Sequence, residues 1–364
     1  MLTRTRRMID AYRDAGYDIT EVNHREIIGE DRTYTPAALY ERYNSRHSGL
    51  MELYRQVTTL AATHDVLMVI YDNVYTPEFL QSLRGIYKVY FCADDPEGAD
   101  VWSKPYVNAF DFAVAGAVNF DATTRVWQKY LEWGAKRAIW SPMGVTPDDY
   151  DAGVTADAIR EHTRTVDVVY VGAADPLKVD RILQMKAALQ DRFQIYGPGW
   201  GNYLTSAGKI RSTMSRRLSR TSLRMLRRDL VPTSNFYLPD EQLVPLYQRT
   251  KIGINVHESY GPCNRRLYAL PANGVMQICD CAEGIDQVFE EGKEVVVYHS
   301  VAEAVDLVRY YLEHEDARKQ IAIAGYMRVM RDYQDLDIFG RVLDKVKRAM
   351  REEGITASKE GKSL

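Results

Sequence analysis

The sequence is poor in the features that mark secreted, zinc-binding and membrane-spanning proteins. It has four cysteines in 364 residues, with no Cys-x2-Cys pair and no His-x3–5-His partner. Neither a disulfide framework nor a zinc site is therefore expected. No run of about 18 apolar residues is present, and the N-terminal segment 1–16 lacks the apolar core of a signal peptide. These absences predict a reduced, cytoplasmic protein that does not span a membrane.

An excess of charge of one sign is also missing. Lys and Arg total 47 against 50 for Asp and Glu, which leaves a net charge of -3. Overall charge therefore gives no reason to expect a nucleic-acid or acidic partner, and any electropositive site must be local. The chain is too long for one ordinary core and suggests two domains.

Short β-branched and aromatic runs alternate with helical patterns along the N-terminal half. Expected strands cover 18–22, 65–72, 87–95, 111–116 and 136–142, and long helices are expected near 36–62 and 120–133. This alternation predicts an α/β fold with a parallel sheet. The chain begins inside a helical pattern, so the strand that normally opens such a domain is expected to be missing.

The same alternation restarts after a segment rich in Pro, Gly and Asp at 141–153. We therefore predict a Rossmann-like domain at 1–145 and a second at 154–335. A C-terminal helix and tail at 336–364 is expected to cross back to the N-terminal domain. In such folds ligands bind at the carboxyl ends of the parallel strands.

Several blocks of the C-terminal half match a known family in order and spacing. They include VDVVYVGAADPLKVDRI, IYGPGW, YQRTKIGIN and NRRLYALPANGVMQICD, and the match covers roughly residues 166–332. The chain resembles the GT-B glycosyltransferases (group 1), and most closely the spore-maturation-protein CgeB-like family. The resemblance implies two Rossmann-like domains facing a cleft, with a nucleotide-diphosphate-sugar donor on the C-terminal domain. It implies a hexosyltransferase-like enzyme that uses neither metal nor cofactor and transfers sugar to a hydroxyl acceptor, whether a glycan, a lipid-linked molecule or another compound.

Two features of this half suit a diphosphate on physical grounds. Gly172 lies between a strand and a helix, so backbone N–H groups and the helix N-terminus can face an anion, with Lys178 or Arg181 adding charge. The alternative is a plain strand-to-helix turn. Arg265 and Arg266 carry planar guanidinium groups that match phosphate oxygens, and the alternative is a solvated surface pair.

The resemblance adds further residues and one departure. Glu258 begins a segment similar to the first half of the two-glutamate motif of retaining GT-B enzymes, in which that glutamate contacts the donor sugar. The glutamate that holds the ribose in related patterns is replaced here by Ala269, so Asp280 or Glu283 is an alternative ribose ligand. The expected donor-binding residues are Gly172, Lys178, Arg181, Gly197, Tyr260, Asn264, Arg265, Arg266 and Asp280.

Acceptor chemistry is expected in the N-terminal domain. Side chains just past the carboxyl ends of parallel strands line the cleft, which selects His24, Asp72, Asp94 and Asp95. A carboxylate or an imidazole in that position suits a general base. Together with Glu258, we take His24, Asp94 and Asp95 as the candidate catalytic residues. The segment Asp94-Asp95-Pro96 also fits a helix N-cap and turn.

The segment 208–228 has eight basic residues and no acidic residue. It predicts a basic, weakly amphipathic helix inserted in the C-terminal domain. Three interpretations remain open: contact with an anionic membrane surface, contact with a phosphate polymer, or a solvated surface insertion. Two other function classes also remain open, namely a nucleotide-sugar epimerase on the same fold and a non-catalytic binding protein that uses this insert.

If the insert at 208–228 attracts an anionic membrane, each exposed Lys or Arg contributes about 1 kcal/mol at low salt. We expect the protein to sediment with vesicles that contain anionic lipid and not with neutral vesicles, and raised ionic strength to weaken the binding. Replacing Arg216, Arg217, Arg220 and Arg224 by Gln is expected to abolish sedimentation. Equal recovery from both vesicle types, or from wild type and variant, assigns the segment to a solvated surface.

Overall fold

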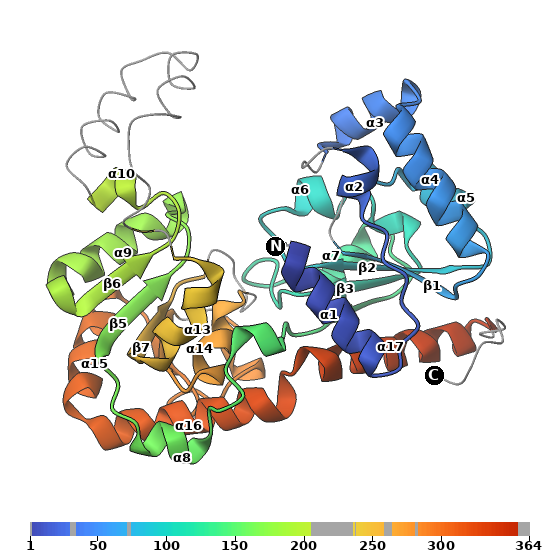
Figure 1. The fold of residues 1–364 in the computed structure, drawn as a ribbon. Helices are drawn as coiled ribbons and strands as arrows, with labels where there is room; N and C mark the ends of the chain where they lie inside the picture. Colours follow the sequence, from blue (N-terminus) through green and yellow to red (C-terminus); the bar gives the residue numbers. More distant parts are fainter. Residues whose placement is uncertain are drawn as a thin grey trace, which may run out of the picture.

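The computed structural model describes residues 2–29, 34–70, 74–204, 236, 238–257, 264–280 and 283–355. Two parallel sheets organise these residues, one with strand order β1-β2-β3-β4 and one with order β6-β5-β7-β8-β9 (Figure 1). The predicted α/β class with two parallel sheets is therefore confirmed. In the part of the chain that the structure describes, no helix is both long enough and apolar enough to cross a membrane.

The first sheet is built from short apolar strands. They are β1 (Val66–Ile70), β2 (Tyr87–Cys92), β3 (Phe112–Ala115) and β4 (Ala138–Trp140). Each strand pairs in parallel with the next, and all four residues of β3 are buried. A strand buried on both faces is expected to be continuously apolar, as FAVA is. The helices of this domain are α1 (Leu2–Asp14), α2 (His24–Ile28), α3 (Pro36–Asn44), α4 (Ser48–Ala61), α5 (Pro77–Ser82), α6 (Ala99–Trp102) and α7 (Val126–Glu132).

Three predictions for this domain were wrong in detail. The segment 18–22 forms no helix and pairs with no strand, and in the described residues β1 is the first strand. The helix expected near 36–62 is two helices, because Arg46 takes a positive φ of 52° between α3 and α4. The helix expected from 120 begins only at Val126, because the Asp121 side chain accepts from the backbone N–H groups of Thr123 and Thr124 and holds a turn.

The second sheet contains β5 (Val166–Val171), β6 (Phe193–Tyr196), β7 (Thr250–Asn255), β8 (Met276–Asp280) and β9 (Val296–Tyr298). One face packs against α9 (Pro176–Leu189), α15 (Val301–Glu313) and α16 (Glu315–Asp332). The other face packs against α13 (Asp240–Gln248) and α14 (Arg266–Ala272). This three-layer arrangement leaves the carboxyl ends of the strands open for a site. The remaining helices of this half are α8 (Ala156–Glu161) and α10 (Gly201–Leu204).

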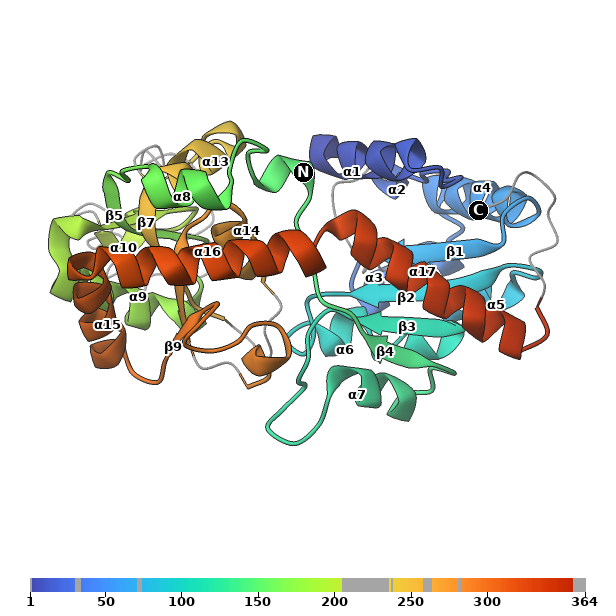
Figure 2. The same cartoon turned by 90° about the horizontal axis from the view of Figure 1, so that it is seen from below.

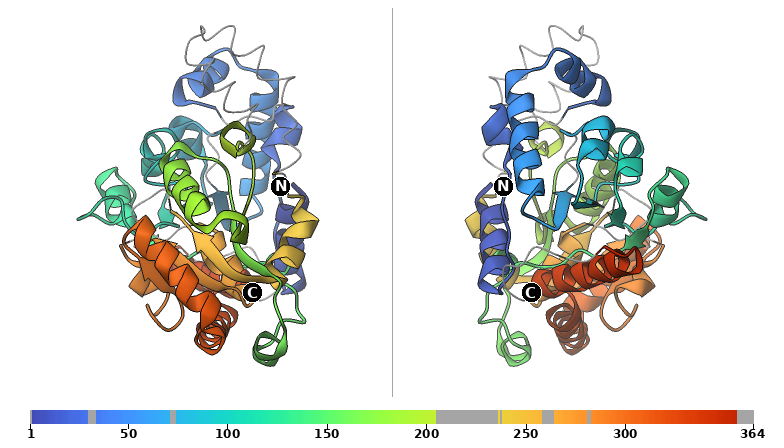
Figure 3. Two further views of the ribbon diagram at one scale, coloured as in Figure 1. Left: turned by 90° about the vertical axis from the view of Figure 1, so that its left-hand side faces the viewer. Right: turned by 90° about the vertical axis from the view of Figure 1, so that its right-hand side faces the viewer.

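The last helix, α17 (Asp335–Glu352), runs from the second domain across the first sheet (Figure 2). It buries Val342, Val346, Ala349 and Met350 against Tyr87, Val89, Phe112 and Val114. Helix α1 lies beside it (Figure 3). The rings of Tyr12 in α1 and Phe339 in α17 stack with their centres 4.2 Å apart. The N-terminal helix and the C-terminal helix therefore pack together on the first domain.

Candidate functional site

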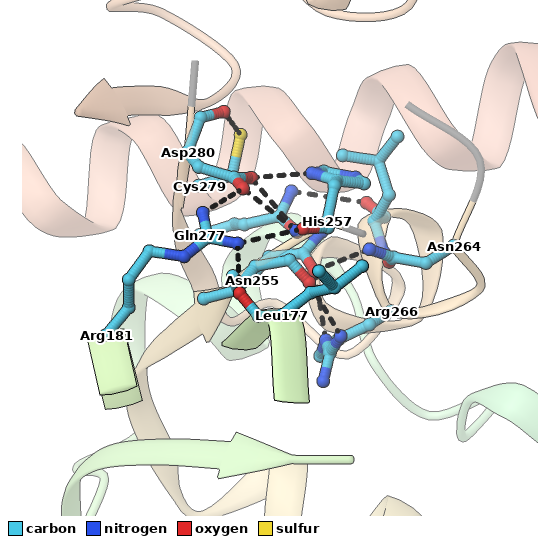
Figure 4. A network of polar contacts seen from close by, with 11 residues as sticks. Leu177, Arg181, Asn255, His257, Asn264, Arg266, Gln277, Cys279 and Asp280 are labelled. Atoms are coloured by element: carbon cyan, nitrogen blue, oxygen red, sulfur yellow. Dashed lines mark hydrogen bonds and ion pairs between the residues drawn. The ribbon is translucent and has the colours of Figure 1, made fainter. Parts of the chain in front are cut away.

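The carboxyl ends of β5, β7 and β8 bring together several of the predicted donor-binding residues. Figure 4 shows a polar network that includes Arg181, Asn264, Arg266 and Asp280. Two groups of contacts make up this network, one around Arg266 and one around Asp280. Each ties the end of β7 to a neighbouring element.

Arg266 is the first residue of α14, and its guanidinium reaches back to two strands. Its Nε donates to Asn255 Oδ1 at 3.0 Å, its Nη2 to the carbonyl of Val256 at 3.3 Å, and its Nη1 to the carbonyl of Val171. The guanidinium also lies 4.5 Å from the centre of the Tyr170 ring. Three of the five N–H groups are used in these contacts, and the described residues supply no acceptor for the other two. Arg266 can therefore anchor the strands and still donate to a ligand.

Gly172 lies directly beside this guanidinium. A Cβ atom at position 172 would lie 2.5 Å from Arg266 Nη1 and 2.8 Å from the Tyr170 hydroxyl. Gly197 follows β6 with φ of +130°, and a Cβ there would lie 2.2 Å from the Gly172 carbonyl oxygen. Close backbone approach therefore requires glycine at position 197, whereas position 172 faces the ends of two side chains, and the turns after β5 and β6 lie against each other.

Asp280, the last residue of β8, accepts several hydrogen bonds. The backbone N–H and the Nδ1 of His257 both contact its carboxylate, at 2.9 Å and 2.7 Å. Arg181 Nη1 donates to Asp280 Oδ2 at 3.1 Å, and its Nη2 donates to the carbonyl of His257 at 3.2 Å. Burial favours a raised pKa for Asp280, but its interactions with His257 and Arg181 outweigh burial and hold the pKa below its ordinary value. The carboxylate is therefore ionised at neutral pH.

Three residues of the network were missed in the sequence, namely Asn255, Gln277 and His257. Asn255 Oδ1 accepts from Asn264 Nδ2 at 2.8 Å, and Asn255 Nδ2 donates to Gln277 Oε1 at 3.0 Å. Asn264 Oδ1 also accepts from the backbone N–H of Leu267 in the first turn of α14. The available signal was a buried amide side chain inside each of two apolar strands, KIGIN and MQICD.

The paired arginines have different partners, although both were predicted to bind phosphate. Arg265 Nε and Nη2 donate to the buried carboxylate of Asp149, at 3.0 Å and 2.6 Å. Asp149 Oδ2 also accepts from the backbone N–H of Thr146 at 2.9 Å. Arg265 thus ties α14 to the linker between the domains, and only Arg266 joins Gly172.

Lys178 is buried in the first turn of α9. The same helix begins with Asp175 as N-cap, whose side chain accepts from the backbone N–H of Leu177 at 2.8 Å. This contact occupies one of the N–H groups predicted to face an anion. Binding of an anion by Gly172 and Lys178 stays a prediction.

The predicted catalytic residues are not gathered at one point. His24 is buried at the start of α2, and Asp95 is 1% exposed and accepts from the Tyr130 hydroxyl at 2.7 Å. Asp95 thus belongs to the core of the first domain, whereas its neighbour Asp94 is exposed just beyond β2. Of these three residues, only Asp94 is therefore exposed to solvent. Four predicted features lie outside the described residues, namely Asp72, Glu258, Tyr260 and the basic insert 208–228.

An open pocket of about 370 Å³ adjoins the Arg181–Asp280 pair. It is lined by Arg181, Asp280, Tyr298, His299, Ser300 and Val301. This volume is within the usual range for small-ligand sites. Within the described ranges, no three His, Cys, Asp or Glu side chains gather in a way that could hold a metal ion.

Known proteins are similar to this chain in part of its sequence and in its fold. The family described as "Glycosyl transferase-like" matches residues 179–335. No curated protein sequence matches the chain. Among solved structures, HepE of Anabaena in complex with UDP shares 14% identity and a TM-score of 0.52, with 82% of each chain covered. A glycosyltransferase from Rickettsia africae shares 13% identity and a TM-score of 0.56, with coverage of 88% of this chain and 84% of that one.

A sucrose-phosphate synthase from Thermosynechococcus elongatus also matches, with 14% identity, a TM-score of 0.53 and coverage of 83% of this chain and 79% of that one. These likenesses extend over both sheets rather than one domain. The predicted GT-B fold is therefore confirmed. The CgeB-like subfamily stays a prediction.

Because Asp95 is buried, its contribution to the stability of the fold can be tested through the pH dependence of unfolding. Burial raises the pKa of Asp95, although hydrogen bonds from Ser103 and Tyr130 oppose the shift, so the folded protein holds this proton to a higher pH than the unfolded chain does. The associated stability is fully present below the ordinary Asp pKa of about 3.9 and is lost as pH rises through the folded value.

We expect Asp95→Asn to remove this loss, so that the variant gains free energy of unfolding relative to wild type between about pH 4 and about pH 7. Urea unfolding at the two pH values measures the effect, with the exposed Asp94→Asn as matched control. A wild-type-to-variant difference that does not change with pH contradicts this account of Asp95.

Proposed function

We propose that the protein is a glycosyltransferase that moves a sugar from a nucleotide-diphosphate donor to a hydroxyl acceptor. The observation that carries the proposal is the Arg266 guanidinium, held beside Gly172 at the carboxyl edge of the second sheet with two N–H groups available. A fixed, planar donor of this kind matches the oxygens of a diphosphate. The match of residues 179–335 to a glycosyl transferase-like family supports the same function.

Charge at this edge also suits a diphosphate leaving group. Arg266 and Lys178 add positive charge near the turn at Gly172, and Arg181 adds a third cation that is balanced by Asp280. In the transfer, the bond from the sugar's anomeric carbon to the diphosphate oxygen breaks, and a bond to the acceptor oxygen forms. Negative charge grows on the departing diphosphate, so preorganised N–H donors stabilise the transition state more than the ground state.

The acceptor belongs, in this proposal, to the first domain. The acceptor hydroxyl must lose a proton as its oxygen bonds to the sugar, and a carboxylate within hydrogen-bond reach can take that proton. Asp94 is the exposed carboxylate just beyond the carboxyl end of β2, so we assign it this role in preference to Asp95 and His24. Hexosyl specificity, metal independence and binding at a membrane surface through 208–228 are further parts of the proposal.

The function is tested by transfer and by binding. UDP and UDP-glucose are the first ligands to use, since structures of HepE contain them, followed by GDP, dTDP and their sugar conjugates. We expect one nucleoside diphosphate to raise the melting temperature by mass action, and its sugar conjugate to release it faster when a hydroxyl acceptor is present. Failure of every nucleotide to bind contradicts the proposal, and release of an epimerised nucleotide sugar replaces it with an epimerase.

The adjacent arginines supply a matched pair of variants. We expect Arg266→Ala to weaken nucleoside diphosphate binding by about 2–3 kcal/mol, as the loss of charge-assisted phosphate contacts should. Arg265→Ala is expected to change binding by less than about 0.5 kcal/mol, because that guanidinium is committed to Asp149. Calorimetry with the best-binding diphosphate measures both.

Because Arg266 also anchors β5 and β7, its variants need a stability control. Arg266→Lys keeps the charge but loses the planar fork, and we expect it to recover only part of the affinity. Melting temperatures recorded without ligand separate a weakened fold from a weakened site. Equal affinities for wild type and a folded Arg266→Ala variant remove Arg266 from the donor site.

A further inference from the structure

The pocket beside Arg181 and Asp280 lies to one side of the Arg266 cluster. Arg266 and Gly172 sit at the ends of β5 and β7, whereas the pocket is formed at the ends of β8 and β9 and the start of α15. With the order β5-β7-β8-β9, one to three strand spacings separate the two places, which is about 5–14 Å. A group attached to a diphosphate at Arg266 can span that distance.

The charges of the pocket lining cancel. Arg181 and Asp280 form an ion pair at 3.1 Å, and the other lining residues are Tyr298, His299, Ser300 and Val301. The first turn of α15 is already capped, since Ser300 Oγ accepts from the backbone N–H of Glu303 and the Glu303 carboxylate accepts from the backbone N–H of His299. A capped helix end and a neutralised arginine make the pocket a poor site for an anion. They leave a mixture of hydrogen-bond donors and acceptors.

The Tyr298 hydroxyl is a buried polar group of the lining that has no explained purpose in the fold. Tyr298 lies beside Asp280 in the strand register, is 3% exposed, and its hydroxyl has no hydrogen-bond partner among the described residues. Burial raises the pKa of Tyr298, and the charge of Asp280 adds to the shift, so the phenol keeps its proton and remains a donor. An unsatisfied buried hydroxyl costs free energy that a phenylalanine in its place would avoid.

We propose that this pocket binds the sugar of the donor, with its hydroxyl groups contacting Asp280, Arg181 and Tyr298. The inference rests on the proposed function, because the donor's diphosphate at Arg266 brings the sugar to the pocket. Carboxylate, guanidinium and phenol groups together accept from and donate to neighbouring sugar hydroxyls. The ligand class is a neutral sugar of about hexose size, which the pocket volume admits.

Tyr298→Phe tests the proposal, because it removes one hydroxyl and leaves the ring in place. UDP and UDP-glucose are the probes, so that the nucleotide and the sugar are measured separately. We expect UDP to bind wild type and variant alike, and UDP-glucose to bind the variant about 10-fold more weakly, as the loss of one hydrogen bond implies. The melting temperature of the unliganded variant is expected to equal or exceed that of wild type. Tyr310→Phe, on an exposed ring of α15, is the matched control and should change neither affinity.

The outcomes separate this proposal from the function on which it rests. If UDP binds wild type and Tyr298→Phe binds UDP-glucose as tightly as wild type does, the sugar does not contact this hydroxyl and the proposal fails, although the nucleotide site stands. Equal loss of UDP and UDP-glucose affinity in Tyr298→Phe also overturns the sugar assignment, since the hydroxyl then serves the nucleotide or the fold. If neither compound binds wild type and no other nucleotide does, the proposed function itself fails.

Discussion

The site depends on one guanidinium that is held by the ends of two strands. Arg266 donates to the carbonyl of Val171, the last residue of β5. It also donates to Asn255 and Val256 at the end of β7. These are backbone and amide oxygens that would otherwise lie at the edge of the sheet with fewer partners, so the arginine stabilises the edge and gains a fixed orientation. Its position explains why residue 172 is glycine, because a methyl group there would collide with the guanidinium.

A second feature of this edge is that two of its three arginines are paired with carboxylates. Arg265, next in the chain, is bound by the buried carboxylate of Asp149, and Arg181 is bound by Asp280. Removing either carboxylate would leave an unpaired cation near the sheet edge, which is more costly than the pair. Arg266 has no carboxylate partner among the described residues, so its positive charge at this edge is not balanced by an ion pair. Arg266 therefore supplies local positive charge in a protein whose net charge is -3.

The two domains are joined by contacts that come from distant parts of the chain. Asp149 of the linker holds α14 of the second domain, and α17 leaves that domain to bury four side chains on the first sheet. The interdomain contact therefore includes an apolar surface as well as ion pairs such as that of Arg137 with Glu352 at 2.7 Å. Apolar burial is less sensitive to salt than surface ion pairs, so α17 carries more of this attachment than the charges do.

Much of the architecture was determined by local pattern. Apolar runs such as VDVVYV and FAVA predict buried parallel strands, and the strand-to-helix alternation predicts two α/β domains, because burial of both sheet faces requires such runs. Pattern also predicted that Gly172 follows a strand and that Asp280 ends one, as the structure has them, at the edge where ligands bind in such folds. The prediction of a strand at 18–22 was wrong, since this segment pairs with no strand. Pairing depends on two segments, and a local pattern describes only one of them.

Only the tertiary structure decided which side chains meet. Arg265 and Arg266 are adjacent residues of the same type. Successive side chains at the start of a helix point in different directions, so Arg265 reaches the linker and Arg266 reaches β5 and β7. Asp94 and Asp95 are likewise adjacent, and one is exposed while the other is buried under Tyr130. His257, Asn255 and Gln277 joined the site only when the strand register was known. Sequence spacing specifies the kinds of groups available, whereas orientation and contact arise from packing between segments far apart in the chain, which no local pattern encodes.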